Sequence, residues 1–312
     1  MRMCAAAVLT AGILALSPAW PLLAQQAPAA PAPPPLVKEN ATKRVSDHVY
    51  AIPDDSVPLV PNVGIIVGTR GTLVVDTGLG PRNGAAILRE VGKVSKNTEL
   101  YLVTTHVHPE HDLGAQAFPA QTKMIRSEDQ QKDIAEFGLQ TAKQFAGRSP
   151  LTAELLQGAE FRKADIVFAT EHALDLGGVR VRVLAMGANH TRGDTAVFVE
   201  PDNVLFSGDV VMTGLPAFSS PASTVRQWLA SLDRFEQLRP ATIVPSHGPF
   251  GGPEIITNYR TYLQTVQARV TALKREGRSL PEVEKTVTGE LSGKYPGGRL
   301  AGTVRAAYAE AP

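Results

Sequence analysis

The pattern of apolar and polar residues in the first third of the chain predicts a β-hairpin followed by a crossover unit. Two strand-like apolar runs, at 63–67 and 72–75, are separated by a short segment that ends in Gly71, where a tight turn needs a glycine. Apolar residues then recur at helical spacing over 82–94, and another strand-like run follows at 100–103. Strand, helix and strand in this order indicate a crossover unit.

A similar pattern recurs in the second half of the chain. Residues 179–184 alternate apolar and polar side chains, and the runs 196–199 and 204–206 predict a second hairpin. Residues 224–238 have a helical pattern and precede a short strand at 242–244. Mixed strands with helices after each half predict an α/β fold: an αβ/βα four-layer sandwich of two mixed β-sheets packed face to face and flanked by helices.

Two further segments are helical in composition. Residues 127–164 are charged; we favour a solvated helix pair there and keep a substrate-covering element as the alternative. Near the C-terminus, apolar residues form one helical stripe, which we interpret as core packing rather than as a partner surface. The stripe consists of Ile255, Tyr259, Tyr262, Val266, Val270 and Leu273.

The N-terminal segment has the composition of an export signal. Residues 1–24 begin with a positive charge at Arg2, continue with an apolar run too short to span a bilayer, and end at a small-residue cleavage site. Residues 25–36 are mostly Ala and Pro, which indicates a linker. We therefore expect a signal peptide (1–24), a linker (25–36) and a folded domain with C-terminal helices (37–312). We also expect a periplasmic or secreted location without stable membrane insertion after cleavage.

Composition narrows the classes of function. The 312 residues are 43% hydrophobic and 20% charged, with a formal net charge of +1. This balance is typical of a soluble globular protein and gives no sign of nucleic-acid binding. The single cysteine, Cys4, lies in the predicted signal peptide, so we expect a mature chain without disulfides or thiolate metal ligands. The partner that we expect is a small-molecule substrate.

Histidines cluster after the predicted strands. Imidazole is the commonest neutral metal ligand, and closely spaced histidines on a turn can converge on one ion. Of the seven histidines, we expect His48 and His172 to be structural. The other five are His106, His108, His111, His190 and His247.

Residues 106–111 read H-x-H-x-E-H, which resembles the H-x-H-x-D-H signature of the metallo-β-lactamase superfamily with glutamate at the aspartate position. Each motif alone is weak evidence for the family. Five motifs in the order that the family has, each at a predicted strand end, make the resemblance specific. It covers nearly all of the predicted domain and implies the metallo-β-lactamase fold. The residues that match the other four motifs of the family are Asp76, His190, Asp209 and His247.

The resemblance implies a centre with two zinc ions. Two metals about 3.5–4 Å apart can share a water, lower its pKa and polarise a carbonyl group, so the implied reaction is hydrolytic. Asp76 is implied to hydrogen-bond the ligand histidines rather than to bind metal. The implied ligands are His106, His108 and His190 for the first zinc, Glu110, His111 and His247 for the second, and Asp209 as a bridge.

Glu110 needs separate treatment because glutamate is one methylene longer than the aspartate of the family. We favour Glu110 as a ligand of a weaker or shifted second site. Asp112 is a conceivable substitute ligand, and a third reading makes Glu110 a proton shuttle that binds no metal. Only Arg192 is a cationic neighbour of a proposed ligand in the sequence, and no cationic cluster indicates a substrate carboxylate.

The residue at position 209 distinguishes branches of the superfamily, because true β-lactamases generally carry cysteine or serine where this chain has Asp209. The aspartate resembles glyoxalase-II-like and lactonase-like members. We therefore expect an exported zinc-dependent hydrolase that uses a metal-bound hydroxide on an ester, thioester or lactone, with Glu110 and Asp209 as catalytic residues. The alternatives are β-lactam hydrolysis, a persulfide dioxygenase with one iron on His106, His190 and Asp209, and a non-catalytic metal-binding protein. Retention of His111 and His247, which such a dioxygenase would not need, favours two metals.

Overall fold

The computed structural model describes residues 33–212, 214–296 and 299–312. The predicted signal peptide, with Cys4, and residues 25–32 of the predicted linker lie outside the described residues. In the part of the chain that the structure describes, no helix has both the length and the apolar character needed to cross a bilayer.

Seven strands form the first β-sheet, in the order in which they occur in the chain. Strands β1 to β4 are antiparallel neighbours, and β4 to β7 are parallel. The predicted first hairpin is therefore β3 and β4, and the predicted crossover unit is β4, α1 and β5. The strands are β1 (Lys43–Arg44), β2 (Val49–Ile52), β3 (Val63–Val67), β4 (Gly71–Val75), β5 (Glu99–Val103), β6 (Lys123–Ser127) and β7 (Ile166–Phe168).

Five strands form the second sheet, in the order β12-β11-β10-β9-β8. Strands β8 to β11 are antiparallel neighbours, and β11 pairs in parallel with β12. The predicted second hairpin is confirmed as β10 and β11, and His172 lies inside β8. The strands are β8 (Glu171–Asp175), β9 (Arg180–Gly187), β10 (Asp194–Val199), β11 (Val204–Gly208) and β12 (Thr242–Pro245).

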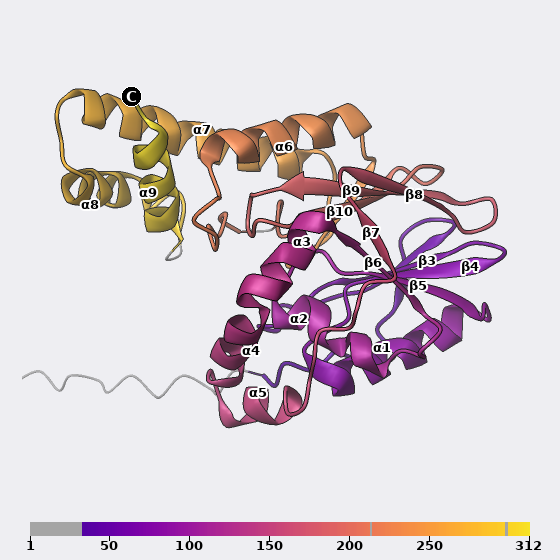
Figure 1. The fold of residues 1–312 in the computed structure, drawn as a ribbon. Helices are drawn as coiled ribbons and strands as arrows, with labels where there is room; N and C mark the ends of the chain where they lie inside the picture. The colour runs from indigo at the N-terminus through magenta and orange to yellow at the C-terminus, as the bar shows by residue number, and fades with distance from the viewer. Residues whose placement is uncertain (1–32, 213, 297–298) are drawn as a thin grey trace, which may run out of the picture. The chain divides into compact units, whose positions relative to one another are not determined.

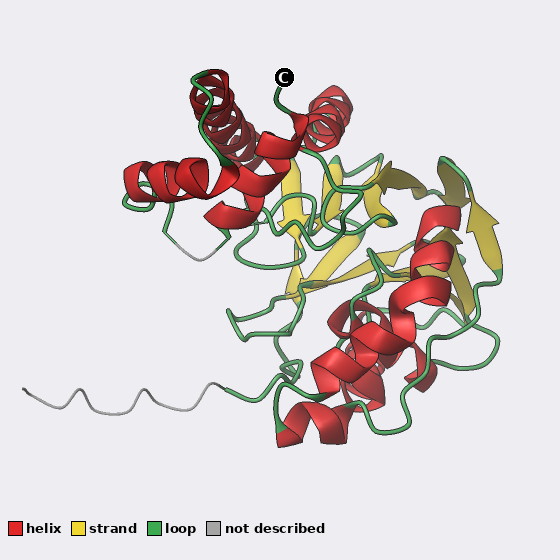
Figure 2. Ribbon diagram, turned by 60° about the vertical axis from the view of Figure 1, so that its left-hand side comes forward, coloured by secondary structure: helices red, strands yellow, loops and turns green. Residues whose placement is uncertain are grey.

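Helices cover the outer faces of both sheets. Figure 1 shows α1 on the outer side of the first sheet and α6 with α7 on the outer side of the second, and Figure 2 shows the strands between these helical layers. The helices are α1 (Gly80–Val94), α2 (Pro109–Asp112), the 3₁₀ turn η1 (Leu113–Ala117), α3 (Glu128–Asp133), the π-helical turn η2 (Ile134–Gly138), α4 (Leu139–Ala146), α5 (Pro150–Leu155), α6 (Val225–Leu238), α7 (Glu254–Arg275), α8 (Leu280–Leu291) and α9 (Leu300–Glu310).

Alternating residues of the central strands supply two different cores. In β10, Val197 and Val199 pack between the sheets, whereas Ala196 and Phe198 pack against the helices of the second half. Because successive side chains of a strand point to opposite faces, a strand covered on both faces is apolar throughout. The four-layer αβ/βα arrangement predicted from the sequence is confirmed.

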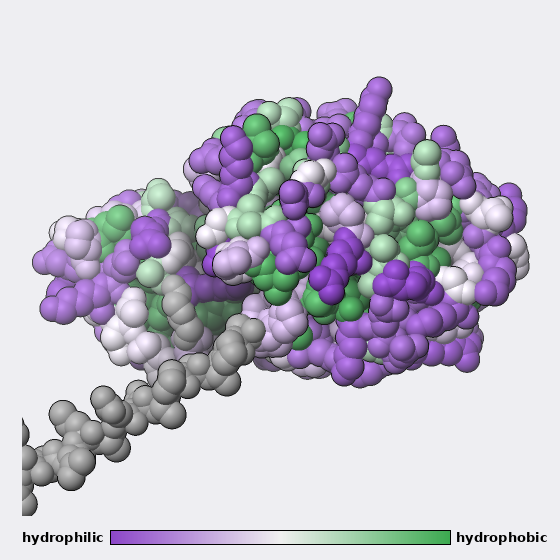
Figure 3. Space-filling model, turned by 90° about the horizontal axis from the view of Figure 1, so that it is seen from below, coloured by the Kyte–Doolittle hydropathy of each residue, from purple (hydrophilic) through white to green (hydrophobic). Residues whose placement is uncertain are grey.

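The helical stripe near the C-terminus is core packing, as predicted. Tyr259, Tyr262 and Val266 of α7 belong to the core that lies over the second sheet, and Ile255 is only partly buried at its margin. The segment predicted as helical over 127–164 is helical only as far as Leu155. Seen from below the view of Figure 1, the surface is largely hydrophilic and is hollowed beside the C-terminal helices (Figure 3).

Candidate metal centre

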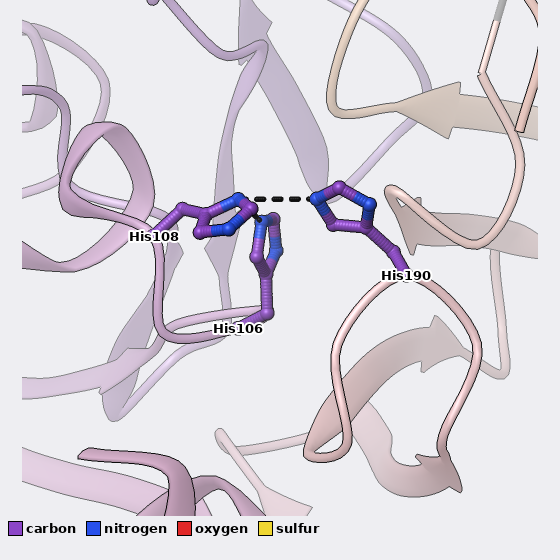
Figure 4. A group of neighbouring side chains, drawn as sticks. All are labelled: His106, His108 and His190. Atoms are coloured by element: carbon purple, nitrogen blue, oxygen red, sulfur yellow. Dashed lines mark hydrogen bonds between the residues drawn. The ribbon is translucent and has the colours of Figure 1, made fainter. Parts of the chain in front are cut away.

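Three histidine rings meet where the two sheets end. His106 follows β5, and His108 immediately precedes the short helix α2, which begins at Pro109. His106 Nε2 and His190 Nε2 each lie 3.1 Å from His108 Nδ1, and Figure 4 shows the three rings turned toward one another. Two nitrogens on one tetrahedral zinc lie about 3.3 Å apart, so the spacing of these rings suits a shared ion.

A second group of side chains lies beside the first. Glu110 and His111 come from the first turn of α2, and His247 follows β12. Their ligand atoms, like those of the first group, lie within 4.8 Å of one another, and His111 Nε2 is 4.0 Å from Glu110 Oε1. The side chain of His247 is 27% exposed, whereas that of His111 is fully buried. The second group is therefore looser.

Asp209 stands between the two groups, after β11. Its Oδ2 is 3.4 Å from His190 Nε2 and 4.0 Å from His106 Nε2. Its Oδ1 is 4.0 Å from His111 Nε2 and 3.9 Å from His247 Nε2. One oxygen of the carboxylate thus faces each group. The structure brings together all seven residues that the sequence predicted.

Hydrogen bonds at the outer nitrogens fix the rings. Asp76 Oδ2 accepts from His111 Nδ1 at 2.9 Å, and Asp76 Oδ1 accepts from the Thr105 amide at 2.7 Å. The Thr105 hydroxyl links Asp76 Oδ2 to His106 Nδ1 through contacts of 3.1 Å each. His190 Nδ1 donates to the Ala217 carbonyl at 2.6 Å. A histidine held in this way presents its Nε2 lone pair to the centre, and Asp76 has the role that the resemblance implied.

The loop that carries His190 is anchored on both sides. The Asp194 carboxylate accepts from the amide of His190 at 2.5 Å and from the hydroxyl of Thr191 at 2.6 Å. The Gly193 amide donates to Asp133 of α3 at 2.9 Å. A Cβ on Gly193 would lie 2.3 Å from the backbone of Gln130, so only glycine allows the loop to approach α3 this closely.

The loop that carries His247 is held by residues from the start of the domain. The Asn62 side-chain amide donates to the carbonyls of Pro245 and Gly248, at 2.7 Å each. The Asp54 carboxylate accepts from the Gly248 amide at 2.8 Å, and the Asp54 amide donates to Asn62 Oδ1 at 2.7 Å. The position of His247 therefore depends on Asp54 and Asn62, which sequence reasoning did not single out.

Burial and mutual charge govern the protonation of the cluster. Burial, followed by the charges of neighbouring histidines, lowers the pKa of His106 and His108, which favours the neutral rings that bind metals. Burial alone would lower the pKa of His111, but the carboxylates of Asp76, Asp209 and Glu110 outweigh it and raise that pKa to about 9. The histidines around Asp209 outweigh its burial and lower its pKa to about 2.

The donor set fits metal ions. Glu110 Oε2, His111 Nε2 and Asp209 Oδ1 are buried and have no hydrogen-bond partner among the described residues. Buried polar atoms are nearly always satisfied, so three unsatisfied atoms on residues of one cluster are consistent with ligand atoms. Histidine nitrogens with carboxylate oxygens are the donors that zinc prefers when thiolates are absent.

Several candidate residues from the sequence lie outside the cluster. The Asp112 carboxylate accepts two hydrogen bonds, at 2.7 and 2.8 Å, from Nη2 of buried Arg126, so it is already occupied. His48 Nδ1 lies 2.9 Å from Asp202 Oδ2, beside β2. Arg192 forms ion pairs with Asp133 at 3.0 Å and with Glu136 at 3.1 Å. Its guanidinium is thus directed to the α3 and η2 segment.

A cavity of about 490 Å³ opens over the cluster. Its wall includes the loop at Val57, Pro58 and Leu59. Arg148, just after α4, and Arg299, just before α9, also line it. The segment over residues 127–164 thus contributes Phe145 and Arg148 to the cavity wall, and a substrate-covering role for it stays a prediction. No sequence spacing relates the two arginines, so sequence reasoning missed them.

Fold and cluster together define an αβ/βα sandwich with a candidate metal centre at the edge where its two sheets meet. The sequence profile of the Metallo-beta-lactamase superfamily matches residues 56–247, and the chain belongs to this superfamily. The Gallus gallus protein "Acyl-coenzyme A thioesterase MBLAC2" is 26% identical over 198 residues, which cover 57% of this chain and 67% of that protein.

Solved structures show the same fold. The inverting sec-alkylsulfatase Pisa1 from Pseudomonas sp. superposes with a TM-score of 0.69 at 15% identity, over 86% of this chain and 49% of that chain. The present chain thus spans about half the length of that sulfatase. A metallo-beta-lactamase from Pontibacter korlensis superposes with a TM-score of 0.54 at 22% identity, over 72% of this chain and 98% of that one.

Proposed function

We propose that this protein is an exported hydrolase with a two-zinc centre that cleaves an ester, thioester or lactone. The observation that carries the proposal is the position of Asp209, whose Oδ2 faces His106 and His190 while its Oδ1 faces His111 and His247. A carboxylate placed in this way suits a bridge between two cations.

Each group of side chains has a role in this proposal. A bound zinc pair supplies an activated water at neutral pH and polarises the substrate carbonyl. The first ion would be held by His106, His108 and His190, and the second by Glu110, His111 and His247. Asp209 would contact both ions and balance part of their charge. Asp76 orients two of the rings, and burial excludes bulk water from the ligand atoms.

A centre with one iron is less well supported. Such a centre would use His106, His190 and Asp209 and would leave Glu110 and His111 with buried, unpartnered ligand atoms. Burying unpaired charged or polar atoms costs free energy, so a function that uses both groups is favoured.

The choice of a carbonyl substrate rests on two supports. Asp209 stands where true β-lactamases of the superfamily generally have cysteine or serine, and the relative MBLAC2 is named as an acyl-coenzyme A thioesterase. β-Lactam cleavage remains the alternative, and the experiment below includes a cephalosporin for that reason.

Export is proposed from the composition of residues 1–36. Expression of the full chain in a Gram-negative host, followed by fractionation and intact-mass measurement, should give a periplasmic protein that lacks about the first 24 residues. A cytoplasmic protein that retains its N-terminus would contradict this part of the proposal.

Elemental analysis of the mature protein tests the centre, together with assays of a lactone, a thioester and a cephalosporin. We expect close to two zinc ions per chain and turnover of at least one substrate. Because aspartate is the residue of the family signature, Glu110→Asp should retain or increase the second zinc. A single iron, or a single zinc with no turnover that Glu110→Asp fails to restore, would overturn the proposal.

A further inference from the structure

Two arginines of the cavity wall form no ion pair with the described residues. Arg148 and Arg299 line the cavity, and neither guanidinium forms an ion pair with any residue that the structure describes. Most arginines elsewhere do form such pairs, for example Arg89 with Glu39. The question is what the two free guanidinium groups bind.

Arg148 is held in place by an aromatic ring. Its guanidinium carbon lies 3.5 Å from the centroid of the Phe145 ring, and that ring lies 5.4 Å from the ring of His108. A guanidinium stacked on an aromatic face keeps its N–H donors free around its edge. Phe145 thus places a planar cation next to the first histidine group at little entropic cost.

Arg299 approaches the centre from the C-terminal helices. Its Nη1 donates to the Leu215 carbonyl at 3.1 Å, which leaves its other donors available. It lines the same cavity as Arg148, and His108 and His190 of the first histidine group form part of that cavity wall.

The acidic residues of the cavity wall are committed to other contacts. Asp54 accepts from the amides of Ser56 at 3.1 Å and Gly248 at 2.8 Å. Glu110 and Asp209 belong to the proposed metal centre. Once bound cations balance Glu110 and Asp209, the two arginines outnumber Asp54, the remaining carboxylate of the wall. A cleft with net positive charge concentrates anions, and a guanidinium binds a carboxylate through paired hydrogen bonds.

We propose that the substrate carries a carboxylate near the scissile carbonyl, and that Arg148 and Arg299 are the specificity-determining residues that bind it. This inference rests on the proposed hydrolytic function and adds the substrate class to it. Arg192, the only cation beside a ligand in the sequence, is excluded from this role because it pairs with Asp133 and Glu136.

Two esters of equal shape provide the test. The 4-nitrophenyl monoester of succinic acid carries a carboxylate where 4-nitrophenyl 4-methylpentanoate carries an isopropyl group. The quantity measured is the ratio of kcat/KM for the charged ester to that for the neutral one. We expect a ratio well above one, which falls about 10-fold in each of Arg148→Gln and Arg299→Gln and further in the double variant, mainly through KM. The exposed Arg275, which lies outside the cavity wall, provides the matched control Arg275→Gln, in which the ratio should not change.

Binding of uncleaved analogues separates this inference from the proposed function. The corresponding amides, N-(4-nitrophenyl)succinamic acid and 4-methyl-N-(4-nitrophenyl)pentanamide, are titrated calorimetrically into wild type and the double variant, with zinc and after chelation. The double variant should bind the charged amide about 10-fold or more weakly than wild type. Failure of both esters to react would count against hydrolysis alone. Equal affinity of the two proteins for the charged amide, or an ester ratio that the variants do not change, would overturn the inference.

Discussion

The two groups of side chains on either side of Asp209 differ in compactness, although each has two buried members and one half-buried member. In the first group, His106 and His190 each contact His108 at 3.1 Å, and the side chains of His106 and His190 are 0% and 5% exposed. In the second, the contact between Glu110 and His111 is 4.0 Å long, and the His247 side chain is 27% exposed.

This difference predicts unequal affinity of the two groups for an ion. A group whose rings are already at ligand spacing loses little conformational entropy when an ion binds. In the second group, Glu110 is one methylene longer than the aspartate of the family signature. Both groups line the cavity, the first through His108 and His190 and the second through Glu110 and His247. We expect the first group to bind zinc more tightly.

The largest effect should come from Asp209→Asn, which removes the charge shared by both groups. We expect kcat/KM to fall at least about 10³-fold, or about 4 kcal/mol of transition-state stabilisation. Zinc content, measured by elemental analysis, should fall in both groups. The control is Asp202→Asn, because Asp202 pairs with His48 and lies outside the cluster. Full zinc content and full activity in Asp209→Asn would show that the two groups are independent.

The variants His106→Ala and His247→Ala should differ in zinc content, by a smaller effect than that of Asp209→Asn. His106 belongs to the three-histidine group and also to a group with His111 and Asp209, whereas His247 belongs only to the second group. We expect His106→Ala to lose most of its zinc and His247→Ala to retain about one ion per chain. Equal loss in the two variants, measured by zinc titration, would contradict the asymmetry.

The smallest of these effects is expected for Asp76→Asn. Asp76 has φ +66°, a conformation that asparagine tolerates, so the variant should keep the backbone. Loss of its charge should weaken zinc affinity by about 10–100-fold. The weaker binding should be concentrated in the second group, because Asp76 contacts His111 directly and reaches His106 only through Thr105. Competition with a chromogenic chelator measures the zinc affinity of each group. Equal weakening of zinc binding in both groups would contradict the prediction that Asp76 acts mainly on the second group.

The fold could be predicted where residue patterns are clear. The pattern correctly predicts both hairpins, α1 and α6, because their strands and helices bury apolar faces in the two cores. It fails for β6, β7 and β8. Strand β6 contains Arg126, which is buried only because Asp112 pairs with it from another segment. Strand β8 has a single buried residue, Leu174, so no alternation is visible in its sequence.

The metal centre was predicted better than the cavity. The order of short motifs at strand ends was enough to single out the residues that the structure brings together, while their roles as ligands stay a prediction. Arg148 and Arg299 follow no such rule. They come from the ends of two helices that the topology brings to one opening, and only the three-dimensional arrangement relates them.

The hydrogen bonds around His247 also determine when the centre can form during folding. Asn62 and Asp54 hold the His247 loop across 183 to 194 positions of the chain. Contacts of such long sequence separation form late in folding. Closing a long loop costs conformational entropy before any native contact stabilises the closed loop. A nascent chain that has emerged as far as Asp209 already contains every ligand of the first group, but the second must wait for β12. We therefore expect assembly to have a direction: the compact group can form before β12 has packed, and the looser group, which needs His247, completes the centre last.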